Sequence, residues 1–165
     1  MVKRILILFF ITVNVIIGGC ANSSKLPEIT IDQEKIDIIK LKEFSKDGKD
    51  LFIPLFDKKA AIEPKYIKMG EKVTLDFENN PPDKMTIQEM FLAPNGKTLY
   101  SDVEIKDISF TQEKNKYFFT IEESYVSKLS SVYFIGRKDL RGYKITTFTG
   151  KDKTIYICVI KTDAK

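Results

Sequence analysis

The sequence has 165 residues, with 27 basic and 23 acidic side chains and a formal net charge of +4 at pH 7. It contains no histidine, which excludes Ser-His-Asp and Cys-His catalysis and histidine-ligated zinc. No long basic run is present, which argues against nucleic acid as a partner. The acidic residues lack the spacing of an EF-hand loop, and we expect neither a metal site nor a cofactor.

The N-terminus has the organisation of a signal peptide. Lys3 and Arg4 form a short cationic start, and residues 5–17 are almost entirely apolar. This run is too short to cross a hydrocarbon core of about 30 Å as a helix. Small residues follow it, as they do before a signal-peptide cleavage site. We therefore predict that residues 1–19 direct export and are then removed.

The residues at the end of this segment, Ile17, Gly18, Gly19 and Cys20, resemble the bacterial lipobox. The resemblance implies that the Cys20 thiol receives a diacylglyceryl group and that lipoprotein signal peptidase recognises Ile17–Gly19 and cuts before Cys20. Two acyl chains hold a protein firmly at a membrane, where a single chain is marginal. We therefore expect a lipid-anchored protein on the extracytoplasmic face of the cell membrane, or at the outer membrane of a two-membrane cell. The alternative is an ordinary secreted protein.

The remaining chain divides into a tether and one domain. Residues 20–33 are predicted to be the lipidated cysteine and a flexible tether, because the segment after Cys20 is small and polar. Residues 34–165 are the predicted domain. Cys158 is the only other cysteine, so no internal disulfide can form. Its apolar neighbours predict a buried strand, in which free cysteine acts as a small hydrophobe; an exposed thiol is the alternative.

The domain carries the patterns of short strands separated by turns. In chain order, the predicted strands are residues 35–42, 51–56, 71–77, 85–92, 99–100, 103–110, 116–121, 132–135, 142–148 and 154–161. Pro54 limits the second of these to an edge strand or a bulge. The third alternates cleanly, with Val73, Leu75 and Phe77 on one face. The only plausible helical turn is at residues 122–129.

The predicted turns also indicate an antiparallel fold. Ala93-Pro-Asn-Gly96 contains an Asn-Gly pair, which is a strong turn signal, and residues 149–153 form a predicted hairpin loop. Roughly eight to ten short strands at this spacing predict a β-sandwich. No amphipathic helices separate the strands, which argues against a parallel α/β fold.

Two segments resemble known families. YIKMGEKV at residues 66–73 looks like the start of strand B in bacterial immunoglobulin-like domains. RGYKITTFTGKDKTIYICVIKT at residues 141–162 resembles the closing hairpin of lipoproteins from Gram-positive bacteria. The resemblance implies an all-β, antiparallel immunoglobulin-like β-sandwich, and it implies no activity.

Arg137 and Arg141 are the only arginines after the signal peptide, and the pattern places them in a loop between late strands. Arginine has a planar, bidentate fork that lysine lacks. The two residues are therefore candidate contacts for a carboxylate or phosphate on a ligand or wall polymer. The alternative, which we favour, is local pairing with Asp139 or another nearby acid.

The sequence contains no recognisable set of catalytic residues, and the function that we predict follows from this. We predict a non-catalytic binding or accessory module, with a protein or a cell-wall polymer as its partner. One alternative is an exported hydrolase that uses carboxylates alone. Another is a surface protease inhibitor that presents the proline-restricted loop at residues 79–84. Aromatic residues are expected mainly in the core, although Tyr117 and Phe119 must point opposite to Phe118.

Overall fold

The computed structural model describes residues 26–31, 33–41, 51–56, 62–100, 104–129 and 136–164. The predicted signal peptide, the lipobox with Cys20 and the predicted strand at 132–135 lie outside the described residues.

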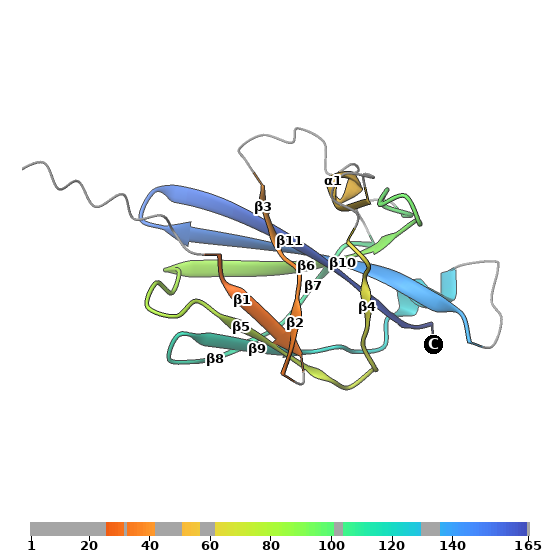
Figure 1. Ribbon diagram of the computed structural model, residues 1–165, viewed down its shortest axis with the longest axis horizontal. Coiled ribbons are helices and arrows are strands. Elements are labelled where there is room, and N and C mark those ends of the chain that lie inside the picture. The colour runs from red at the N-terminus through yellow and green to blue at the C-terminus, as the bar shows by residue number, and fades with distance from the viewer. Residues whose placement is uncertain are drawn as a thin grey trace, which may run out of the picture.

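Two β-sheets face each other (Figure 1). The first has the order β2 (Glu34–Ile36), β1 (Glu28–Ile31), β5 (Lys72–Asp76), β9 (Lys116–Thr120) and β8 (Thr111–Glu113). The second has the order β3 (Ile39–Leu41), β11 (Asp152–Asp163), β10 (Lys138–Thr149), β6 (Lys84–Leu92) and β7 (Lys106–Asp107). β4 (Lys65–Tyr66) adds to β11 in parallel, and the other described pairs are antiparallel.

This strand order confirms the predicted antiparallel β-sandwich. β1, β5, β9 and β8 follow the order A-B-E-D of an immunoglobulin sheet, and β7, β6, β10 and β11 follow the order C′-C-F-G of its partner. The long hairpin of β10 and β11 pairs from Lys138↔Asp163 to Thr149↔Asp152. It closes on a turn at Gly150, whose positive φ of 57° suits glycine. The loop consists of residues 150–151 and lies inside the predicted loop at 149–153, whose other residues are paired in the two strands.

The core between the sheets is formed by apolar residues at every second position of the strands. Val73 and Leu75 of β5 and Phe77 directly after it are all buried on one face of the chain, as predicted. They meet apolar residues from the second sheet, among them Ile87 of β6 and Ile145 of β10. Because side chains alternate across a strand, the polar neighbours of these residues face outward. Packing of this core supplies the stability that a disulfide gives antibody domains.

A second apolar cluster covers the outer face of the second sheet, where the short helix α1 (Ile53–Phe56) lies (Figure 1). Phe52 and Leu55 have no exposed surface and pack against residues such as Met90, Ile157 and Val159. The predicted strand at residues 51–56 is therefore wrong. Pro54 sits in the first turn of the helix, where a backbone N–H has no intrahelical acceptor and proline costs nothing.

Two other boundaries differ from the prediction. The sandwich begins at β1, so residues 28–31 belong to the sheet and not to the tether predicted for 20–33. Ile29 and Ile31 are buried in the core, and the strand pairs with β5. Within the predicted strand at 103–110, only Lys106–Asp107 pairs with β6 among the described residues. The chain then crosses to the other sheet and enters β8 at Thr111.

Candidate functional site

A buried polar cluster lies inside the sandwich at the start of β10. Arg141 and Tyr143 point inward from β10, and Glu89 points inward from β6, opposite Tyr143. Arg141 Nη1 donates to Glu89 Oε1 at 3.1 Å, and the Tyr143 hydroxyl donates to the same oxygen at 2.6 Å. Arg141 also donates to the Glu122 carbonyl at 2.7 Å. Three polar side chains are thus hydrogen-bonded to one another within an apolar core, although Arg141 Nε has no hydrogen-bond partner among the described residues.

This geometry corrects the placement of Arg141. It lies within a strand and not in a loop, and it is 0% exposed. Its guanidinium carbon lies 5.0 Å from the centre of the Phe91 ring, a cation–π contact that adds to the ion pair. A ligand outside the domain cannot reach it without opening the sandwich. Arg141 is paired with an acid, but this acid is Glu89, 52 positions away, and not Asp139 or another acid nearby in the sequence.

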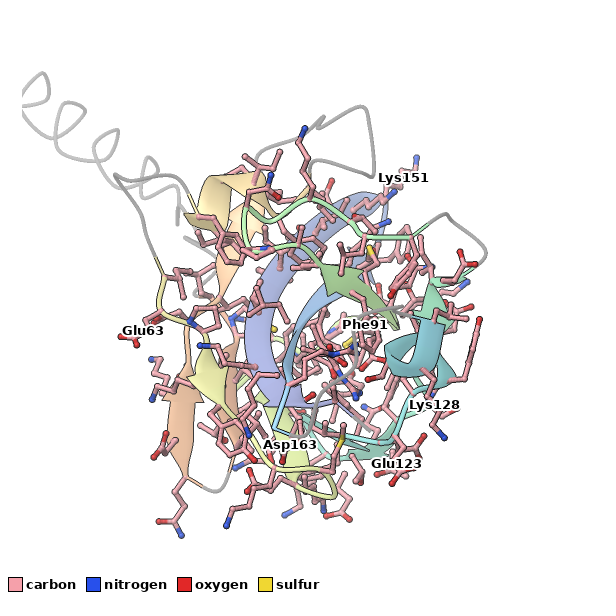
Figure 2. All side chains as sticks on the ribbon, turned by 90° about the vertical axis from the view of Figure 1, so that its right-hand side faces the viewer. Glu63, Phe91, Glu123, Lys128, Lys151 and Asp163 are labelled. Atoms are coloured by element: carbon pink, nitrogen blue, oxygen red, sulfur yellow. The ribbon has the colours of Figure 1, made fainter. Side chains whose placement is uncertain are left out.

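Arg137 stands two positions before Asp139 on the same face of the chain, beside the 3₁₀-helix η3 (Tyr125–Leu129). Its Nη2 contacts Asp139 Oδ1 at 3.0 Å and donates to the Ser127 carbonyl at 2.6 Å. The Ser127 hydroxyl donates to Asp139. Arg137 and Asp139 side chains are each 11% exposed. This network fixes η3, the helical turn expected at 122–129, over the end of the sandwich seen in Figure 2.

The carboxylates of these two clusters are each paired with an arginine. Glu89 is bound to Arg141 and Asp139 to Arg137, so each carboxylate has a fixed counter-charge. Burial raises the pKa of the Tyr143 phenol well above its usual value, and the charge of Glu89 raises it further. The phenol therefore stays protonated and donates its hydrogen bond throughout the physiological range.

Sequence reasoning missed Glu89, although a signal for it exists. In β6 the inward positions are Met85, Ile87, Glu89 and Phe91. A carboxylate in the apolar phase of a strand predicts a buried partner of opposite charge. The same alternation places Arg137, Asp139 and Arg141 on one face of the chain.

A groove of about 320 Å³ lies beside β9 on the described surface. Its lining combines charged, hydroxyl and aromatic side chains, including Lys72, Lys106, Ser109, Phe118, Thr120 and Glu122. Lys106 Nζ lies 3.0 Å from Glu122 Oε2, and Lys72 Nζ lies 3.9 Å from the centre of the Phe118 ring. Phe118 thus faces away from the buried Tyr117 and Phe119, as predicted.

A second hollow of about 450 Å³ has Phe91 in its lining. Arg137 and Asp139 line it together with mostly apolar residues such as Leu99, Tyr100 and Leu140. Because the guanidinium of Arg137 is already bound to Asp139, this hollow offers an anion little uncompensated charge.

Cys158 is 3% exposed in β11, which confirms the predicted burial, and burial raises the pKa of its thiol to about 12. The thiolate is the reactive species. On a chain carrying Cys20→Ala, so that Cys158 is the single thiol, we expect a thiol reagent to react far more slowly in buffer than in guanidinium chloride. Rapid modification of the folded chain, followed by absorbance, would contradict the buried placement.

Among the described residues, no group of three or more Cys, Asp or Glu side chains is placed to hold a metal ion. No helix in the described part of the chain is long and apolar enough to cross a membrane. The chain matches no protein-family model, no curated protein and no solved structure.

Proposed function

We propose that this chain is a bacterial lipoprotein whose β-sandwich is a non-catalytic binding or accessory module at the outer face of a membrane. The observation that carries the proposal is the sequence Ile17-Gly18-Gly19-Cys20, placed after a cationic start and a short apolar run. Residues 21–27 separate Cys20 from β1, and at about 3.5 Å per residue they span at most roughly 25 Å. The sandwich would then lie close to the bilayer and to the polymers around it.

The ionic contacts of the domain favour binding over hydrolysis. A carboxylate-dependent glycosidase needs two acids that face one cleft about 5–10 Å apart. The acids Glu89 and Asp139 are instead paired with arginines. In the groove beside β9, Glu122 is paired with Lys106, and Asp107 accepts a hydrogen bond from Gln88 Nε2 at 3.1 Å.

The loop at residues 79–84 counts against the inhibitor alternative. Pro82 is buried, and the Asp83 backbone N–H donates to the Phe148 carbonyl at 2.8 Å. The Asp83 side chain in turn accepts a hydrogen bond from the Gly150 N–H at 2.7 Å. The loop is held against the β10–β11 turn, whereas a protease inhibitor must project its loop into the enzyme's cleft.

Substitution of Cys20 by serine tests the anchor. A serine hydroxyl cannot receive the thioether-linked lipid, so we expect the chain either to leave the membrane fraction or to stay there as unprocessed precursor. Cell fractionation with intact-mass measurement distinguishes these forms.

The matched control is Cys158→Ala, which removes the other cysteine and should leave the chain anchored and acylated. A Cys20→Ser chain that stays in the membrane at its mature mass would refute the lipid anchor, because the anchor requires the Cys20 sulfur.

A further inference from the structure

The groove beside β9 exists because β8 and β9 have different lengths. β8 pairs with β9 only from Glu113↔Lys116 to Thr111↔Phe118, while β9 continues to Thr120. Residues 108–110 cross from the second sheet to the first and form the opposite wall. The volume of about 320 Å³ is at the small end of the usual range for ligand sites.

Three hydroxyl groups in this groove are available to a ligand. Ser109, Thr111 and Thr120 are exposed and line it, and none of their side chains hydrogen-bonds to another described residue. Each hydroxyl can donate one hydrogen bond and accept two. The groove therefore offers several unused donors and acceptors close together.

The charges in the groove cancel. Its two ammonium groups belong to Lys72 and Lys106, and its two carboxylates belong to Asp107 and Glu122. Lys106 is paired with Glu122, and Lys72 rests on the Phe118 ring. A phosphate or a polyanion would have to disturb these contacts to gain a counter-charge. A neutral ligand can use the same groups as hydrogen-bond partners.

The floor of the groove is apolar. Ile108, Phe110 and Phe118 are half-buried along it, and Phe119, which faces the core, is buried. Aromatic and aliphatic surface beside free hydroxyls, paired ammoniums and carboxylates matches a molecule with an apolar C–H face and a rim of hydroxyl groups. A pyranose ring has these two surfaces.

We propose that the groove beside β9 binds a neutral saccharide segment, with hydrogen bonds to Ser109, Thr111 and Thr120 and packing on its aromatic floor. The proposal deepens the binding function proposed above and rests on it for the source of the ligand, namely a glycan outside the membrane. The binding itself depends only on the described groove.

Calorimetric titration of the full chain in a sugar-free zwitterionic detergent tests this proposal. The probes are chitotetraose, cellotetraose and maltotetraose, with inorganic phosphate as the anionic comparison. The variant Ser109→Ala/Thr111→Val/Thr120→Val removes the three hydroxyls at nearly constant shape. The control is Thr86→Val, an exposed threonine of the other sheet outside the groove lining.

We expect at least one tetrasaccharide to bind both the unmodified chain and the Thr86→Val control. Losing up to three hydrogen bonds should weaken binding to the triple variant at least about tenfold, while its circular dichroism stays unchanged. Equal affinity for the triple variant, no binding of any tetrasaccharide, or preferential binding of phosphate would each overturn the proposal. The Cys20→Ser fractionation is independent of these titrations, so failure of the saccharide site and failure of the anchor are distinguishable.

Discussion

Replacing Arg141 with methionine is expected to lower the free energy of unfolding by about 3–5 kcal/mol, because it leaves the Glu89 carboxylate buried without its counter-charge. Glu89 is 3% exposed and would retain only the Tyr143 hydroxyl among the partners described above. Urea unfolding followed by circular dichroism measures this change. Lys35→Met is the matched control, since the Lys35–Glu28 pair is largely exposed; its effect should be within about 0.5 kcal/mol.

Replacing the whole cluster should have a much smaller effect than breaking it. Buried ion pairs pay a desolvation cost that apolar side chains of similar volume avoid. Here the Nε of Arg141 is buried without a hydrogen-bond partner among the described residues, which adds to that cost. The combined variant Arg141→Met/Glu89→Leu/Tyr143→Phe is therefore expected to recover most of the stability that Arg141→Met loses. If Arg141→Met alone unfolds like the Lys35→Met control, the cluster does not stabilise the fold as described.

The sequence predicts the parts of this fold that depend on alternation. Residues 71–77 and 116–121 correspond closely to β5 and β9, because every second residue of each strand is apolar and buried, in contrast to its more exposed neighbours. The segment at 51–56 does not show this contrast. It is apolar on all sides and covers a sheet with a single turn of helix, and short apolar runs do not distinguish helix from strand.

The candidate sites depend on contacts between distant parts of the chain. Arg141 and Glu89 are 52 positions apart and meet only because β10 pairs with β6. Without that register, an arginine beside other charges suggests a loop, and the sequence pattern accordingly predicts one. The groove beside β9 arises from the difference in length between β8 and β9. No local sequence pattern predicts where the pairing between two strands ends.

Substitutions at the contact between Phe52 and Gly142 are also expected to change the free energy of unfolding strongly. A Cβ atom at Gly142 would lie 2.6 Å from Phe52 Cζ and 2.9 Å from Leu92 Cδ1, so the Phe52 ring occupies the space that other residues would need. We expect Gly142→Ala to destabilise the fold by about 1–3 kcal/mol through overpacking. Phe52→Ala should cost about 3–5 kcal/mol, because it empties a fully buried site.

Combining the two substitutions tests the Phe52–Gly142 contact more directly than either substitution alone. In a Phe52→Ala background, the methyl group that Gly142→Ala adds enters the space that the ring has left, and alanine restricts the unfolded chain more than glycine does. Gly142→Ala should then be neutral or stabilising, which reverses its sign relative to the unmodified chain. A double-mutant cycle in urea measures this coupling. Additive effects would mean that Phe52 does not occupy the site above Gly142, and that the segment carrying α1 is held to the sheet by other contacts.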